Sequence, residues 1–304
     1  MRREPRRRNV HPGVPAMSLT SFVPHIPLEE YSERLKEHFV MRRENGILEV
    51  RFHTLGKEAL WGFELHRALP QMFQYVGQDP ENECMILTGT GDHWIKTGDG
   101  ASFKAVEDDP ETRVNSIYDL WYVDGTRLVE NVLWGRNFPI ISVINGPGFH
   151  TEFGLLCDLT IAADDTLFWE RHYCGGMAPG DGQFLVYQQL LGTKRAAHAM
   201  YTRYQGIPAN EALEWGLINE VHPREKLLPR AWELAHLILQ QDRIVRRMTV
   251  EIVRRPWKRL MTDDFAMHFA HECFAAAVHK SDHAENYERY KKDWGAGVEK
   301  SVDR

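Results

Sequence analysis

Residues 138–182 constrain the fold of this chain more than any other stretch of the sequence. They begin with an apolar run, Ile140–Ile144, which has the pattern of a buried strand. The turn at residues 145–148 (Asn-Gly-Pro-Gly) must end this strand, because its two glycines and its proline cannot continue it. A short apolar helical segment and a second apolar run, Leu159–Ala163, follow directly. Strand, turn, helix start and strand in this order predict an α/β fold.

The polar residues of the same stretch indicate chemistry. His150 and Thr151 come just after the turn, and His172 precedes a Pro-Gly-Asp-Gly loop that contains Asp181. A histidine with a pKa near 6.5 is a useful base at neutral pH, and a carboxylate can orient its ring. We therefore predict that His172 and Asp181 form a catalytic pair. The alternative from the sequence alone is a surface histidine and an aspartate that only shapes a turn.

The bulk composition excludes several classes of protein. The chain has 304 residues, enough for one large domain with a helical appendage. Its formal net charge of -6 gives no reason to expect a nucleic-acid partner or an anionic membrane. No apolar run approaches the length of a transmembrane helix. A cytoplasmic enzyme is the class that we expect.

Metal and disulfide sites are not predicted. The four cysteines are widely spaced without a CxxC motif, so we expect reduced thiols, with Cys84 and Cys157 in the core. The 15 histidines include no HExxH motif, and His268 with His271 is the pair that spacing alone could offer to a metal. We therefore expect an enzyme without a metal.

The order of elements divides the chain into three parts. Residues 1–22 are rich in arginine and proline and predict a disordered extension. From residue 23 to about 225 strands alternate with helices, and residues 226–304 read as helical. The predicted strands are residues 40–44, 47–52, 84–89, 140–144, 159–163 and 217–221, and the predicted helices are residues 28–38, 63–75, 114–133, 184–191, 194–201 and 208–215.

Five motifs in this order resemble the crotonase (enoyl-CoA hydratase/isomerase) superfamily across roughly residues 38–280. They are ILTGTG (86–91), PIISVINGP (139–147), CDLTIAADDTLF (157–168), APGDG (178–182) and NEALEWGLINEV (210–221). The resemblance implies a spiral of ββα units with two roughly perpendicular sheets, a C-terminal helical region, and a homotrimer or a dimer of trimers.

The chain departs from the hydratases of that superfamily at the residues that hydrate a thioester. Hydratases carry one glutamate in a GGG-x-x-E helix start and a second just before a PGxGG loop. Here His150 and Thr151 stand where the glycines are expected, and His172 stands near the second glutamate. The run at residues 94–99 also replaces the small residues of the first oxyanion-hole peptide. The resemblance therefore disfavours hydration by a glutamate pair.

The sequence is more similar to the β-diketone hydrolases, the group of 6-oxocamphor hydrolase. The matching features are Trp61 with His66, His150 after the NGP turn, His172 ahead of Asp181, the run LLPRAWELA (227–235), and Glu272 after His271. These enzymes use the crotonase fold without coenzyme A. The resemblance implies a cofactor-independent retro-Claisen hydrolysis of a cyclic or otherwise apolar β-diketone to a keto acid.

The resemblance also implies roles for the remaining site residues. His150 and Trp61 would donate hydrogen bonds to a substrate carbonyl, and Glu272 would pair with His66 or protonate the enolate. Phe103, Lys96 and Thr151 complete the predicted substrate-binding set, with Trp94 and Trp169 as further pocket walls. The alternatives are core packing for Trp61 and a solvated helix carboxylate for Glu272.

Two other functions remain open from the sequence. The first is a coenzyme-A-dependent crotonase, such as a thioester hydrolase, a dehalogenase or an isomerase, because an aspartate in the PGDG loop is compatible with several of these. The second, from a different class, is a catalytically silent crotonase-fold partner protein.

Overall fold

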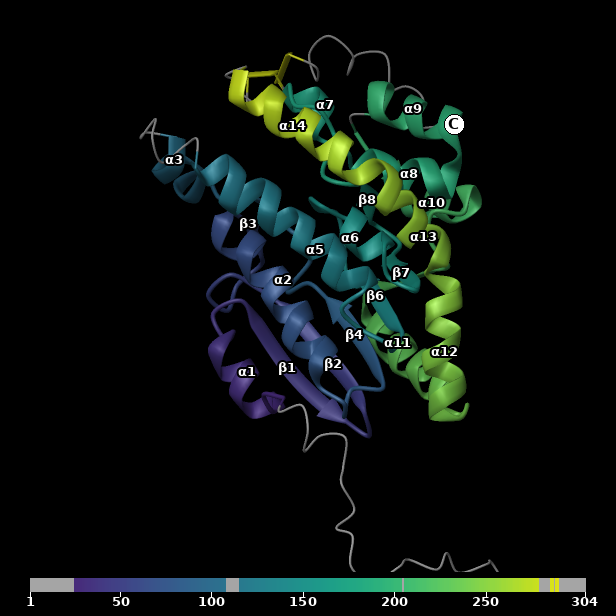
Figure 1. Cartoon of the computed structure of the whole chain (residues 1–304). Coiled ribbons are helices and arrows are strands. Elements are labelled where there is room, and N and C mark those ends of the chain that lie inside the picture. Colours follow the sequence, from purple (N-terminus) through teal and green to yellow (C-terminus); the bar gives the residue numbers. More distant parts are fainter. Residues whose placement is uncertain (1–24, 108–114, 204, 279–284, 287, 290–304) are drawn as a thin grey trace, which may run out of the picture.

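A computed structural model describes residues 25–107, 115–203, 205–278, 285, 286, 288 and 289 (Figure 1). The predicted disordered extension at residues 1–22 lies outside the described residues. Within them, no helix combines the length and the apolar character needed to cross a bilayer.

A six-stranded sheet forms the centre of the molecule, with the strand order β1-β2-β4-β6-β7-β10. The hairpin β1–β2 is antiparallel, and every other neighbouring pair is parallel. Two small sheets, β3-β5 and β8-β9, lie apart from it. The strands are β1 (Phe39–Glu44), β2 (Ile47–Phe52), β3 (Leu60–Trp61), β4 (Cys84–Thr88), β5 (Thr97–Gly98), β6 (Ile140–Ile144), β7 (Leu159–Ala163), β8 (Leu167–Phe168), β9 (Ile207–Pro208) and β10 (Glu220–His222).

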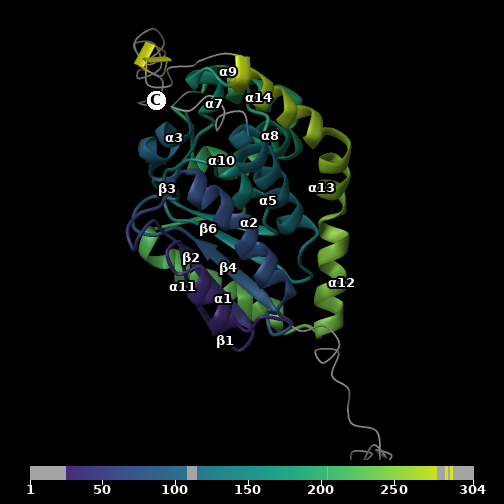
Figure 2. The same cartoon turned by 60° about the vertical axis from the view of Figure 1, so that its left-hand side comes forward.

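Helices cover both faces of this sheet (Figures 1 and 2). Along each strand the side chains alternate between the faces. One set, which includes Leu48, Val50 and Leu87, belongs to the core that α2 (Phe63–Gln78) and α5 (Asp124–Leu133) complete. The other set, which includes Ile86, packs against α11 (Arg224–Leu239). Burial on both faces explains why the central strands are continuously apolar in sequence.

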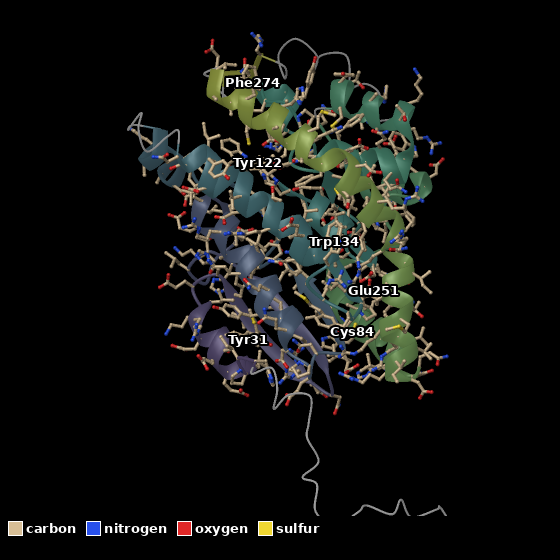
Figure 3. All side chains as sticks on the ribbon, viewed as in Figure 1. Tyr31, Cys84, Tyr122, Trp134, Glu251 and Phe274 are labelled. Carbon is tan, nitrogen blue, oxygen red and sulfur yellow. The ribbon has the colours of Figure 1, made fainter. Side chains whose placement is uncertain are left out.

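Apart from α1, which lies beside β1, and α12, which lies beside α11, the remaining helices gather at the end of the sheet where the parallel strands finish (Figure 1). There α14 crosses close to the π-helical segment η2, and the ring of Tyr122 in η2 lies 5.4 Å from that of Phe269 (Figure 3). The bounds of the helical elements not yet given are α1 (Leu28–Arg34), α3 (Gly100–Glu107), η2 (Ile117–Val123), α6 (Glu152–Leu155), α7 (His172–Gly175), α8 (Gln183–Leu191), α9 (Thr193–Thr202), α10 (Ala209–Trp215), α12 (Arg243–Val253), α13 (Arg255–Leu260), η3 (Met261–Phe265) and α14 (Ala266–Val278).

Most predicted elements are confirmed, with several differences. The predicted helix at residues 28–38 ends at Arg34, and the described part of the predicted helix at residues 114–133 is divided into η2 and α5. The predicted strand at residues 217–221 is wrong at its start, because β10 spans only Glu220–His222 while Leu217 and Ile218 are buried outside it. The predicted boundary at residue 225 also falls inside α11, which packs on the sheet and therefore belongs to the same core. Cys84 and Cys157 are free, buried thiols, as predicted, and Cys84 lies in the sheet region (Figure 3).

Candidate active site

Two histidines and one aspartate meet at the helical end of the sheet. Asp181 Oδ2 lies 3.3 Å from His150 Nδ1 and 3.7 Å from His172 Nε2, and the two imidazole rings are 5.4 Å apart. All three side chains are largely buried. The structure therefore brings together residues that the sequence separates by 31 positions, from His150 to Asp181. We call this group, together with Glu272, the histidine cluster.

The NGP turn after β6 places His150. Asn145 anchors the turn through its side-chain amide, which donates to the Gly91 and His93 carbonyls. His150 itself adopts φ 51, a left-handed conformation that is uncommon for a residue with a side chain. The indole of Trp94 holds this backbone by donating to the His150 carbonyl at 3.1 Å.

Trp61 and His66 pack against the same imidazole. Trp61 ends β3, Gly62 caps the next helix, and α2 begins at Phe63, so the chain turns between the two aromatic rings. The Trp61 ring stacks on His150 at 3.8 Å between centroids and meets His66 edge-on at 5.2 Å. The predicted association of Trp61, His66 and His150 is therefore present.

His172 opens α7, and Glu170 holds it. Glu170 Oε1 lies 2.9 Å from His172 Nδ1 and also accepts a hydrogen bond from the backbone N–H of His172. The second oxygen of Glu170 accepts from the N–H of Tyr173. The His172 ring consequently directs Nε2 toward Asp181 and Glu272, with Glu272 Oε1 at 3.9 Å.

Glu272 joins the cluster from α14. One of its oxygens accepts hydrogen bonds of 2.7 Å from the N–H groups of both Gly180 and Asp181, and the other accepts from Trp121 Nε1. This contact requires glycine at position 180, because a Cβ there would lie 2.1 Å from the His268 carbonyl oxygen of α14. The helix carboxylate is fully buried, so it is neither solvated nor paired with His66 as the sequence allowed.

The charges of the cluster are strongly perturbed. Burial opposes protonation of His150, but Glu152 and Asp181 outweigh it and raise its pKa to about 9. Burial likewise opposes protonation of His172, whereas Asp181, Glu272 and Glu170 raise its pKa well above the usual value. Burial would raise the pKa of Asp181, yet His172 and His150 hold it at about 2.

The outer groups shift in directions set mainly by desolvation. Burial, with Asp181 nearby, raises the pKa of Glu272 to about 8. Burial, with His150 nearby, lowers the pKa of His66 to about 4. At neutral pH the cluster thus combines a neutral His66, an ionised Asp181 and a protonated Glu272. The raised pKa of His172 leaves its ring largely protonated at neutral pH, so only the neutral fraction of this ring can act as a base.

His172 Nε2 does not hydrogen-bond directly to either Asp181 or Glu272. Distances of 3.7 Å and 3.9 Å exceed a direct hydrogen bond and suit a bridging water or substrate oxygen. Around the cluster several buried polar atoms of the described residues make no hydrogen bond of good geometry: His66 Nδ1, the Thr151 and Tyr187 hydroxyls, and the Gln183 amide oxygen. Buried polar groups of this kind normally contact water or a ligand.

Three predicted site residues are placed differently from the others. Lys96 lies at the surface, paired with Glu58, and makes no contact with the histidine cluster within the described residues. Phe103 packs in α3 against Phe63, with ring centroids 5.3 Å apart, and the backbone of this region pairs with Trp61 through β5. Thr151 is buried beside Tyr187.

The two additional tryptophans differ in burial. Trp94 is a core residue, fully buried between Phe52 and Phe153, so the prediction that it lines a pocket is wrong. Trp169 is partly exposed, donates to the Gln205 carbonyl and carries the Arg171 guanidinium over its ring. Its place in a pocket wall stays a prediction.

The sequence reasoning missed Glu152 and Glu170. Glu152, the first residue of α6, lies 2.9 Å from His150 Nδ1, and burial raises its pKa. Each glutamate is two positions from the histidine that it contacts, and this spacing was the available signal. The expectation that histidine and aspartate replace the glutamates of this stretch is therefore corrected, because carboxylates and imidazoles stand there together.

The cluster also has the ligand types of a metal centre. One ligand atom each of His150, His172 and Asp181 lie within 4.8 Å of one another, and no other such group occurs in the described part of the chain. The ring nitrogens concerned already face carboxylates, so a divalent ion would have to replace protons at these positions. His268 and His271 do not form a comparable group, and His271 Nδ1 instead lies 2.7 Å from the Met267 carbonyl oxygen.

The family model described as enoyl-CoA hydratase/isomerase matches residues 42–296, which is most of the chain. The chain belongs to the crotonase superfamily. The fold and the resemblance predicted from the sequence are thereby confirmed.

Relatives of this chain carry different activities. A solved β-diketone hydrolase from the cyanobacterium Anabaena sp. PCC 7120, bound to (S)-3-oxocyclohexyl acetic acid, is 31% identical with a TM-score of 0.75, over 82% of this chain and 97% of that one. A crotonyl-CoA hydratase of Syntrophomonas wolfei is 30% identical over 57% of this chain and 65% of its own length. A hydroxycinnamoyl-CoA hydratase-lyase of Pseudomonas fluorescens is 27% identical over 67% and 73%, respectively.

Proposed function

We propose that this crotonase-superfamily protein is a hydrolase that cleaves the carbon–carbon bond of an apolar β-diketone, without coenzyme A or another cofactor. The observation that carries the proposal is the position of His172 Nε2, 3.7 Å from Asp181 and 3.9 Å from Glu272; we propose that one water molecule binds in the gap between these groups, beside a base, an anion and an acid. The likeness to the Anabaena β-diketone hydrolase supports the same chemistry. The product would be a keto acid.

His172 activates the water. In the fraction of molecules whose His172 ring is neutral, Nδ1 faces Glu170 and Nε2 is directed at the gap, where it removes a proton as the water oxygen attacks one ketone carbon. Asp181, ionised beside it, stabilises the imidazolium that forms. The attack produces a tetrahedral intermediate that carries its negative charge on the former carbonyl oxygen.

His150 and Trp61 face that oxygen in our proposal. Because its pKa is raised to about 9, His150 is protonated at neutral pH and can donate through Nε2 while Nδ1 contacts Glu152. A donor aimed at developing charge is worth about 3–4 kcal/mol of barrier. The stacked Trp61 indole fixes the plane of this ring and covers it with apolar surface.

Glu272 completes the reaction. The bond between the tetrahedral carbon and the neighbouring carbon breaks, and its electron pair forms the enolate of the second ketone. Glu272, protonated because its pKa is about 8, donates a proton to the enolate carbon. The imidazolium of His172 then returns the proton to Glu272 across 3.9 Å, directly or through the next water, and the cycle closes. One water is consumed and no other reactant is needed.

A coenzyme-A-dependent reaction is the competing function, because relatives found by sequence are named as CoA hydratases. The two are separated by ultraviolet loss of a panel of cyclic and linear β-diketones, measured beside hydration of crotonyl-CoA. We expect diketone loss only. Turnover of crotonyl-CoA alone, or thermal stabilisation by coenzyme A in proportion to its concentration, would contradict the proposal.

We further propose a homotrimer or a dimer of trimers, on the resemblance to the family alone. Light scattering coupled to size-exclusion chromatography tests it, and a monomer at micromolar concentration would contradict it.

A further inference from the structure

Glu170 is a buried carboxylate to which the resemblance gave no role. Its side chain is 2% exposed, and its two oxygens contact the His172 ring at 2.9 Å, the His172 N–H at 2.6 Å and the Tyr173 N–H at 3.2 Å. Glu170 therefore holds both the backbone at the start of α7 and the imidazole ring of His172. A side chain fixed at both ends in this way restricts the rotation of the ring that it contacts.

The contact determines which nitrogen of His172 carries the proton. A carboxylate only accepts hydrogen bonds, so the neutral ring donates Nδ1–H to Glu170 and leaves its lone pair on Nε2. Nε2 is the nitrogen that faces the gap toward Asp181 and Glu272. The ring of a general base must have this tautomer.

Asp181 cannot supply that orientation. Its Oδ2 lies on the Nε2 side of His172, at 3.7 Å, and is closer to His150 Nδ1, at 3.3 Å. On this side a carboxylate favours Nε2–H, the tautomer without a free lone pair in the gap. Asp181, which the sequence predicts as the partner of His172, thus supplies negative charge beside the ring. Another group must set the orientation of the ring.

We propose that Glu170 is the positioning residue of His172, which fixes the Nδ1–H tautomer so that Nε2 can accept a proton from bound water. The consequence for rate rests on the proposed function, whereas the consequence for the tautomer does not. Without Glu170, the carboxylates that the described residues place near the ring are Asp181 and Glu272, both on the Nε2 side. The neutral ring then takes the Nε2–H form.

Nitrogen-15 NMR of histidine-labelled protein tests the tautomer directly, at a pH where the His172 ring is neutral. The His172 signals are assigned as those that disappear in His172→Gln. We expect Nδ1–H in the wild type and in Glu170→Gln, whose amide oxygen can still accept, and Nε2–H in Glu170→Ala. An unchanged Nδ1–H tautomer in folded Glu170→Ala would overturn the proposal.

Steady-state kinetics on a diketone give the second readout. We expect Glu170→Ala to lower kcat by about 10²–10⁴-fold, the range typical of a lost general base or a wrong tautomer, with little change in KM. Glu170→Gln should lose about tenfold, because the charge that supports the imidazolium is gone while the contact remains. If Glu170→Ala fails to fold, Glu170→Gln decides: a retained Nδ1–H tautomer supports the proposal, and an Nε2–H tautomer in this folded variant overturns it.

Glu220→Ala is a matched control. Glu220 contacts His222 at 2.7 Å with the same spacing of two residues, but this pair lies on β10 and is partly exposed. We expect its kcat to equal that of the wild type. If the wild type turns over no diketone, the proposed function fails, and the NMR tautomers still decide the role of Glu170.

Discussion

Replacing Glu272 by glutamine should stabilise the protein and inactivate it together. The carboxyl has an ordinary pKa of 4.5 that is raised to about 8 in the folded protein, first by burial and then by Asp181. Between these values the folded protein binds more protons than the unfolded chain, so this group lowers stability as pH rises from 4.5 to 8. A pH of 7 is about 2.5 units above the pKa of this carboxyl in the unfolded chain. The free energy of unfolding is therefore lowered by about 3 kcal/mol at pH 7, at 1.36 kcal/mol per unit.

Glutamine does not ionise, and its amide oxygen can still accept from the Gly180 and Asp181 N–H groups, but its NH2 group cannot accept from Trp121 Nε1. The free energy of unfolding, measured by urea titration from pH 4 to 8, should therefore be lower in Glu272→Gln than in the wild type near pH 4, by the loss of this one hydrogen bond. The variant should gain on the wild type as pH rises, by about 3 kcal/mol at pH 7. Its kcat should fall by about 10²-fold or more, because no acid remains to protonate the enolate.

Glu251→Gln is the surface control, since Glu251 lies on α12, away from the cluster (Figure 3). It should show no such pH-dependent gain. A Glu272→Gln variant that is less stable than the wild type across this whole pH range would refute the reasoning. So would a gain that is constant with pH.

Three further predictions follow from the site. The kcat/KM profile should be bell-shaped: it falls toward acid pH as the neutral fraction of His172 is lost, because nearby carboxylates raise the pKa of this ring well above its usual value, and it falls near pH 8 as Glu272 ionises, whereas a flat profile from pH 6 to 9 would contradict both assignments. Gly180→Ala should lower kcat and destabilise the fold, because its Cβ would lie 2.1 Å from the His268 carbonyl oxygen of α14. Thermal denaturation checks this, with Gly192→Ser as the comparison, because a Cβ at position 192 would meet no atom and would be disfavoured only by the positive φ of that residue. Dialysis against a chelator should leave diketone turnover unchanged and added Zn²⁺ should inhibit it, since the metal would take the ring nitrogens that carry protons; loss of activity on chelation would show that a metal is needed.

The sequence predicted the scaffold of the site well, because its signals are local. An apolar run followed by Asn-Gly-Pro-Gly can only be a strand and a turn, and both were found at Ile140–Ile144 and after it. The association of Trp61 with His66 also followed from a local signal, since Gly62 separates a strand end from a helix start.

The parts that the sequence could not predict depend on packing between distant segments. The residues around Glu272 in its helix form no clear apolar stripe, so the sequence does not indicate which face of the helix is buried. Glu272 is fully buried because α14 contacts the loop that contains Gly180. Lys96 is near the motif residues in sequence, yet its side chain points to Glu58 at the surface. Glu152 and Glu170 were overlooked because the family pattern directed attention to missing glutamates at other spacings.

The most direct test of the account is turnover of a cyclic β-diketone in ¹⁸O-labelled water by the wild type and by His172→Gln, with the keto acid analysed by mass spectrometry. We predict that the wild type forms a keto acid with one labelled oxygen in its carboxyl group, and that the variant is slower by about 10²–10⁴-fold. A wild type that consumes no diketone, or a His172→Gln variant as fast as the wild type, would contradict the central claim.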